Sequence, residues 1–202
     1  MESTYEPDRK RKKRRPPPPL SSQYLHDEAR RYLNRYTPSV SQLRRVLMRR
    51  VDKCVRFHGG EREEGIQLVD ELLDKLERAG VIDDSSFAQA WAVSLNRRGI
   101  PARGIRARLR QKGVPAAVVE DALCALDEVM GRDAELLRAC AYARRRRLGP
   151  CRRDAAQREA RAKKDLAAMA RAGFPYDIAR RVIFTEDFDA LVEAAENGWA
   201  RL

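Results

Sequence analysis

The fold class is decided by residues 68–123, LVDELLDKLERAGVIDDSSFAQAWAVSLNRRGIPARGIRARLRQKGVPAAVVEDAL. One face of the central helix predicted there has the i, i+3, i+4, i+7 spacing of an amphipathic helix: Phe87, Ala90, Trp91, Ser94 and Leu95. Gly99 with Pro101, and Gly113 with Pro115, each mark the end of one helix and the start of the next. Each predicted helix has a narrow apolar stripe and is too short to be stable alone, so the helices must pack on one another.

The same pattern continues on both sides of this segment. Ala, Leu, Arg and Glu dominate between the turn signals and β-branched residues are sparse, which favours helices. We predict an all-α chain with helices at 22–34, 39–53, 62–79, 84–98, 102–112, 115–129, 132–147, 154–172 and 175–184, and a candidate further helix at 186–197.

The sequence also repeats itself. Residues 111–115, QKGVP, lie 60 positions before residues 171–175, RAGFP, and the same shift places Leu109 on Met169. A weaker copy begins upstream near Leu43 and has about twelve extra residues. A repeat of roughly 50–60 residues built from three short helices predicts tandem, helix-turn-helix-like modules in an elongated, curved protein.

These features divide the chain into five predicted segments. They are a disordered basic and Pro-rich tail at 1–20, three-helix repeats at 21–80, 81–130 and 131–185, and an acidic segment at 186–202. The tail contains seven consecutive cations, Arg9 to Arg15, followed by four prolines, a composition that repels itself and favours an extended chain. It is either a solvated tail or a basic arm that adds weak affinity for nucleic acid.

Composition limits the classes of function. The net charge is +12 and charged residues make up 36% of the chain, which favours an anionic partner such as nucleic acid or an anionic membrane surface. No apolar run approaches the length of a membrane span, and the start of the chain lacks the apolar region of a secretory signal. We therefore expect a soluble, cytoplasmic protein with no membrane partner, whose four cysteines are reduced.

No catalytic motif stands out. The sequence contains no GxGxxG, Walker-type loop, GxSxG or HExxH. Cys54 and His58 have the spacing of two metal ligands, but no second pair completes a site. Asp83 and Asp84 are better explained as helix caps than as catalytic acids. We therefore expect no enzyme activity, no cofactor and no bound metal.

Basic residues gather at matching places in successive repeats. Residues 97–112 contain seven cations and no acid, and residues 138–164 contain eleven cations and two acids. Aromatic residues are only 6% of the chain and do not interleave these runs, which favours phosphate contact over base stacking. The candidate partner- or DNA-binding residues are Arg97, Arg98, Arg103, Arg106, Arg108, Arg110, Lys112, Arg144, Arg145, Arg146, Arg147, Arg152, Arg153, Lys163 and Lys164.

The order of these motifs resembles the RecX family of recombination regulators. The resemblance is most specific in GVIDD at 80–84, Phe87-Ala88, and RRGIPARGIRARLRQKGV, with Val119 and Leu123 closing the module. Weaker resemblance at 164–183 and 41–53 extends it over roughly 24–184.

The resemblance implies tandem three-helix repeats that bind the RecA recombinase directly and lodge in the groove of its filament on DNA. It further implies reduced strand exchange, ATP hydrolysis and coprotease activity in DNA repair and the SOS response, and we expect the protein to act as a monomer. The chain departs from the family pattern in its basic N-terminus and in an insertion near Glu61 to Glu64.

Three other functions fit parts of the sequence. A stand-alone helical DNA-binding protein would bind duplex without a recombinase. A helical nuclease would need clustered His and carboxylate residues, which the sequence lacks. A membrane-surface binder would need a strongly apolar exposed face, which the repeats do not offer.

Overall fold

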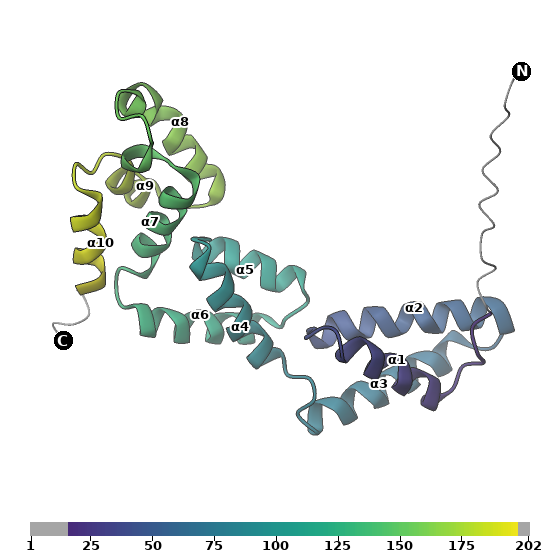
Figure 1. Cartoon of the computed structure of the whole chain (residues 1–202). Helices are drawn as coiled ribbons and strands as arrows, with labels where there is room; N and C mark the ends of the chain where they lie inside the picture. Colours follow the sequence, from purple (N-terminus) through teal and green to yellow (C-terminus); the bar gives the residue numbers. More distant parts are fainter. Residues whose placement is uncertain (1–15, 198–202) are drawn as a thin grey trace, which may run out of the picture.

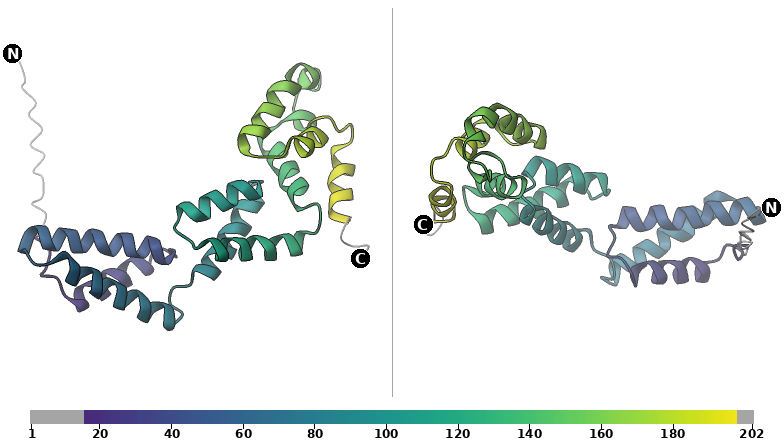
Figure 2. Two further views of the ribbon diagram at one scale, coloured as in Figure 1. Left: turned by 180° about the vertical axis from the view of Figure 1, so that it is seen from behind. Right: turned by 45° about the horizontal axis from the view of Figure 1, so that its top comes forward.

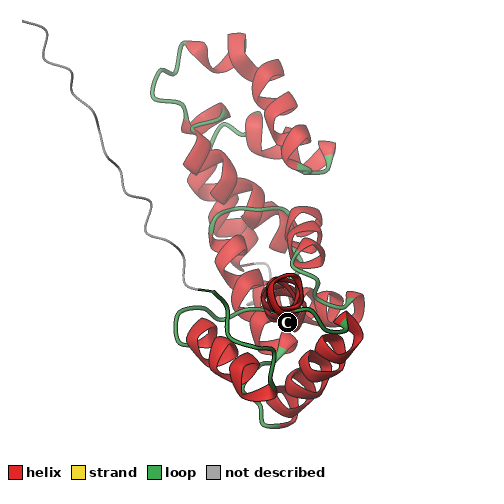
Figure 3. Ribbon diagram, turned by 90° about the vertical axis from the view of Figure 1, so that its right-hand side faces the viewer, coloured by secondary structure: helices red, strands yellow, loops and turns green. Residues whose placement is uncertain are grey.

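The protein is an elongated row of helices with no strand in the part that the computed structural model describes, residues 16–197 (Figures 1 and 3). These residues form ten α-helices and one short 3-10 turn, which confirms the all-α prediction. The helices are α1 Ser22–Leu33, α2 Val40–His58, α3 Arg62–Arg78, α4 Asp84–Arg97, α5 Ala102–Gln111, α6 Ala116–Met130, α7 Ala134–Arg146, α8 Gln157–Ala172, α9 Tyr176–Ile183 and α10 Phe188–Asn197, and the 3-10 turn is Gly149–Cys151.

Three groups of helices follow one another along this row (Figures 1 and 2). Each group has its own apolar core. Module 1 (α1–α3) packs around Leu43 and Leu47, and module 2 (α4–α6) around Ile105 and Leu109. Module 3 (α7–α9) packs around Met169 and also contacts α10. All five of these side chains are fully buried. The tandem three-helix architecture is thus present, while the division of the chain into five segments at the predicted bounds stays a prediction.

The repeated turn has the same geometry in modules 2 and 3. Gly113 and Gly173 have φ of 85° and 105°, a region that residues with a side chain rarely adopt, and each ends the second helix of its module. The next residue, Val114 or Phe174, is buried in the module core. The proline after it begins the third helix. The shift of 60 positions seen in the sequence therefore superposes equivalent structural positions.

The segment before α1 differs from the expectation. Residues 16–20 were predicted to belong to a disordered tail, but they lie against module 1, where Leu20 packs on the core. Cys54 Sγ donates a hydrogen bond to Pro18 O at 3.3 Å, and His58 Nε2 lies 2.7 Å from Pro17 O. The remainder of the predicted tail, residues 1–15, lies outside the described residues.

These contacts explain two further features of module 1. Helix α2 continues to His58, five residues beyond the predicted end, because Gly59 is the first helix-ending residue that the chain meets. Cys54 and His58 do lie on one side of α2, as their spacing indicated. Their polar atoms face backbone carbonyls, however, so these residues fasten the polyproline segment to α2.

Modules 1 and 2 meet at the start of α2, near the C-terminal end of α5. The buried Ser39 donates its hydroxyl proton to Lys112 O at 2.7 Å, and it also forms a capping box with Gln42. Asp84 Oδ1 accepts a hydrogen bond from Val40 N at 2.9 Å. Burial raises the pKa of Asp84, while the bond from Val40 opposes that effect. This junction is therefore a small set of hydrogen bonds.

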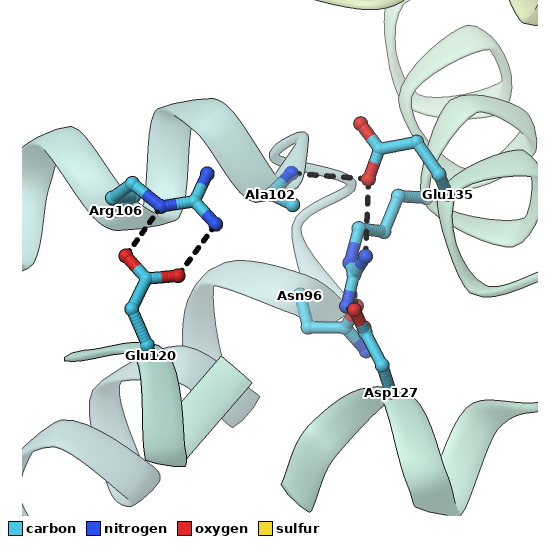
Figure 4. Close-up of polar contacts among 7 residues, drawn as sticks. Asn96, Ala102, Arg106, Glu120, Asp127 and Glu135 are labelled. Carbon is cyan, nitrogen blue, oxygen red and sulfur yellow. Dashed lines mark hydrogen bonds and ion pairs between the residues drawn. The ribbon is translucent and has the colours of Figure 1, made fainter. Parts of the chain in front are cut away.

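Modules 2 and 3 meet around a buried arginine. Arg138 on α7 is 1% exposed and donates to three acceptors from different segments. Its Nε lies 2.8 Å from Asn96 Oδ1, its Nη1 lies 3.0 Å from Glu135 Oε2, and its Nη2 pairs with Asp127. Figure 4 shows the three acceptors converging at this place. The same Glu135 carboxylate accepts from Ala102 N at 3.1 Å, which fastens the start of α5 to α7.

The acidic C-terminal segment covers part of module 3. Phe188, Leu191 and Val192 of α10 pack on its core, and Ala195 is 4% exposed. The candidate helix at 186–197 is therefore present, while residues 198–202 lie outside the described part of the chain.

Candidate nucleic-acid interface

Helix α6 supplies an acid to the basic stretch 97–112. Arg106 donates two hydrogen bonds of 2.7 Å to the two carboxylate oxygens of Glu120 (Figure 4). Arg110 lies 3.7 Å from the same carboxylate. The hydrogen bonds from Arg106 lower the pKa of Glu120 and raise that of Arg106. Two of the seven candidate cations in this stretch are thus partly neutralised within module 2.

Arg152 holds module 3 together. The carboxylate of Asp165 is buried and accepts from Gly149 N and from Arg152 Nε, each at 2.8 Å, while Arg152 Nη2 pairs with its other oxygen. These bonds are the main cause that raises the pKa of Arg152. A buried polar group without hydrogen-bond partners is costly, and these bonds supply the partners of Asp165. We therefore assign Arg152 to the fold.

Two further candidate cations have neighbours on their own chain. Arg144 Nη2 lies 3.2 Å from Asp189 of α10, in an exposed ion pair. Lys112 Nζ lies 4.8 Å from the centre of the Trp91 ring. Both contacts are weak in water, so these side chains can still turn toward a partner.

The remaining ten candidate cations are exposed and form no ion pair with any residue between 16 and 197. We call them the unpaired cations. They lie near the end of α4, on α5, at the end of α7, and on or just before α8: Arg97, Arg98, Arg103, Arg108, Arg145, Arg146, Arg147, Arg153, Lys163 and Lys164.

Modules 2 and 3 place one of these cations at their boundary. Arg103 at the start of α5 lies beside the Gly173 turn of module 3, and it lines a pocket of about 710 Å³. The pocket also contains Arg132 and Arg138, together with the acids Asp127 and Glu135. Because acids line the pocket together with the cations, it is less suited to a phosphate than a purely basic pocket would be.

Sequence reasoning missed a basic face on α2. Arg45, Arg49 and Lys53 are exposed, are spaced four residues apart, and form no ion pair among the described residues. The i, i+4 spacing was the available signal. The sequence alone does not distinguish these residues from neighbouring Arg44 and Arg50, which pair with acids, because all of them are cations on the same helix.

The described part of the chain offers little for other chemistry. Within residues 16–197, no three His, Cys, Asp or Glu side chains are grouped so that they could hold a metal ion. None of the helices in that range has the length and apolar composition that crossing a bilayer requires. Asp83 acts as the N-cap of α4, since its carboxylate accepts from Ser85 N and Ser86 N at 2.9 Å each.

The fold and its exposed cations define a class: a modular protein of tandem three-helix units with basic surfaces. Comparison with known families narrows that class. The model of the second three-helix domain of RecX matches residues 83–123, which correspond to α4, α5 and the first half of α6.

Relatives extend the match along the chain. The regulatory protein RecX of Myxococcus xanthus is 47% identical over 165 residues, which cover 81% of this chain and 86% of the relative. The regulatory protein RecX of Mycobacterium avium is 31% identical over 146 residues, covering 70% and 80%, and that of Corynebacterium efficiens is 35% identical over 121 residues, covering 57% of each. The chain belongs to the RecX family. No solved structure matches it significantly.

Proposed function

We propose that this protein regulates recombination by binding a RecA-type recombinase filament on DNA and reducing its strand exchange, ATP hydrolysis and coprotease activity, without catalysis of its own. The observation behind this proposal is the 47% identity, over most of both chains, to a regulatory protein RecX. The name of that relative supports the role of regulator, and the finer steps rest on the arguments below.

The shape of the molecule suits a long partner. Three modules in a row offer surfaces along the whole length of the chain, and each module buries its own core within one polypeptide (Figure 2). A single copy can therefore lie along a filament, and we propose that the monomer is the active form. A filament on DNA presents both protein and phosphates to such a ligand.

The unpaired cations are the best candidates for phosphate or acidic protein contact. A cation that already bonds an acid on its own chain gives up that bond when it binds a phosphate, whereas an unpaired one does not. We therefore rank Arg97, Arg98, Arg103 and Arg108 above Arg106 and Arg152 in the proposed interface.

The first experiment measures ATP hydrolysis by the host's recombinase on single-stranded DNA while this protein is added far below one copy per recombinase subunit. Inhibition at those amounts is expected if the protein caps or disassembles filaments. Inhibition only when the protein is abundant enough to coat the DNA would contradict the proposal and favour a stand-alone DNA-binding protein.

A charge-matched pair of variants tests the surface. We expect Arg97→Ala, Arg98→Ala, Arg103→Ala and Arg108→Ala together to weaken inhibition and to flatten its salt dependence, because each lost phosphate contact removes about 0.7 from the logarithmic slope on single strands. The control replaces four cations that form exposed ion pairs elsewhere: Arg30, Arg44, Arg62 and Arg78. If the two quadruple variants weaken inhibition equally, the effect comes from the lower net charge and the assignment of these four residues to the interface is wrong.

A further inference from the structure

A groove between α1 and α2 of module 1 contains the basic face of α2 and lies apart from the unpaired cations, which belong to modules 2 and 3. It consists of two adjoining pockets of about 680 and 360 Å³, which share Tyr32 and Val46. The larger pocket begins at the polyproline segment, and the smaller one reaches Gln111 and Lys112 of module 2. The groove thus runs from the start of the described chain across the first module junction.

Cations dominate the lining of this groove. Its acid, Glu28, is nearly buried and is bonded at 2.8 Å by both Arg31 and Arg50, so one carboxylate is matched by two guanidinium groups. The other charged side chains that line the two pockets are basic: Arg35, Arg45, Arg49, Lys53 and Lys112. Four residues span about 6 Å of helix axis, so Arg45, Arg49 and Lys53 form a regular row along α2.

Tyrosine rings lie among these cations. Tyr24, Tyr32 and Tyr36 line the larger pocket, and Tyr32 also lines the smaller one. The rings of Tyr32 and Tyr36 have centroids 4.9 Å apart, and Tyr36 is 58% exposed. The sequence prediction that aromatic residues do not interleave with cations concerned the two basic runs at 97–112 and 138–164, and this groove lies mainly in a different part of the chain. Folding brings the tyrosines beside the row of cations because Tyr24 and Tyr32 lie on α1, Tyr36 lies in the loop that follows it, and the cations lie on α2.

We propose that this groove binds a single-stranded segment of nucleic acid, with unpaired bases stacked on Tyr36 and Tyr32 and with phosphates along Arg45, Arg49, Lys53 and Lys112. A basic track beside exposed aromatic rings is the combination that binds single strands without sequence preference. Duplex DNA hides its base faces inside the stack and therefore cannot use the tyrosines. An acidic peptide would use the cations but would gain little from the rings.

This site goes beyond the proposed function, and it rests on that function only for the choice of DNA as the nucleic acid. A strand held here would lie on module 1, while the unpaired cations belong to modules 2 and 3. The protein could then hold displaced or free single strand beside the filament that it regulates.

Fluorescence anisotropy of the full chain with labelled oligonucleotides tests the proposal. We expect a 20-nucleotide thymidine strand to bind about tenfold more tightly than an abasic strand of equal length, since stacking on one or two rings supplies that difference. Tyr32→Ala with Tyr36→Ala should bring the two strands to equal affinity. Tyr176→Ala removes another exposed tyrosine, on module 3, and should change neither affinity.

The cations give a second, independent readout. Arg45→Ala with Arg49→Ala should lower the logarithmic salt slope for the thymidine strand by about 1.4, while the preference for bases over abasic sites remains. Tyr36→Phe keeps the ring and should bind like the wild type, and circular dichroism of each variant confirms that its helices are intact.

Three outcomes would overturn the groove assignment. They are equal binding of thymidine and abasic strands by the wild type, unchanged binding by the double tyrosine variant, and displacement of the strand by 20-residue polyglutamate as effectively as by unlabelled DNA. These outcomes do not touch the proposed function, which is measured by recombinase ATP hydrolysis. Conversely, a protein that binds strands in this groove but never inhibits the recombinase would fail only the proposed function.

Discussion

Replacing Arg138 with methionine should destabilise modules 2 and 3 together. The guanidinium of Arg138 is 1% exposed and bonds one residue each on α4, α6 and α7: Asn96, Asp127 and Glu135. Methionine keeps most of the length and the apolar stem of the side chain, so the change removes the charge and its hydrogen bonds while leaving little empty volume.

The size of the effect follows from the exposure of the acceptors. Removing one partner of a fully buried ion pair costs about 3–5 kcal/mol, because the other charge stays uncompensated. Here the side chains of Asp127 and Glu135 are 45% and 23% exposed, so water recovers part of that loss. We therefore expect the free energy of unfolding to fall by about 2–3 kcal/mol. For a chain of this length that is a fall of about 4–12 °C in melting temperature.

Thermal unfolding followed by circular dichroism measures the change, and hydrogen exchange locates it in α4, α6 and α7. Arg145→Met is the matched control, because Arg145 lies on the same helix, is exposed, and has no ion-pair partner among residues 16–197. It should alter stability by less than about 0.5 kcal/mol. If Arg138→Met melts within the error of the control, the buried arginine does not join the modules and the reasoning fails.

Three further changes have defined outcomes. Gly99→Ala should lower the free energy of unfolding in urea by at least about 2 kcal/mol more than Gly80→Ala does. Both glycines have positive φ, but only at Gly99 would a Cβ overlap the backbone of α7. Equal losses of stability in the two variants would contradict this close approach. Asp84→Asn should keep the bond to Val40 N without the half-buried charge. Because burial raises the folded pKa of Asp84, the wild type should lose stability relative to this variant as the pH rises above 3.8, and a parallel pH profile would refute that cause. The exposed Cys124 should react with Ellman's reagent before the buried cysteines; Cys124→Ser should abolish the fast phase, and a fast phase that survives would show that another thiol is accessible.

Much of the fold was readable from glycine, proline and short polar residues. The turns at Gly113 and Gly173, the proline starts of α6 and α9, and the cap at Asp83 were all predictable, because each depends on a few neighbouring residues. The hydrogen bonds from Ser86 to Asp83 lower the pKa of that carboxylate, as expected for a helix cap.

Contacts between modules could not be predicted from such local signals. Asp83 and Asp84 are adjacent in sequence, yet Asp83 caps its own helix and Asp84 bonds Val40, which lies 44 positions away. No periodicity in the chain encodes that distance. The same holds for Arg138, which is indistinguishable in the sequence from the solvent-exposed arginines that follow it on α7.

The candidate interface was only partly readable for a related reason. A run of cations shows how much charge a segment has, but it does not show which acids on other helices face it. Glu120 and Asp165 therefore remove Arg106 and Arg152 from the unpaired set without any warning in their own segments. The tyrosines of α1 acquire basic neighbours in the same way, through packing.

The two module junctions differ in mechanical terms. Modules 1 and 2 are joined by hydrogen bonds of Ser39 and Asp84 at the start of α2, and the apolar cores of the two modules are separate. Hydrogen bonds gathered at one place resist separation of the two modules but resist bending between them only weakly. At the junction of modules 2 and 3, by contrast, Arg138 bonds residues on three helices, which resist bending in several directions. Among residues 16–197 we therefore expect bending to concentrate at the junction of modules 1 and 2, so that the curvature of the molecule can change while modules 2 and 3 keep their relative arrangement.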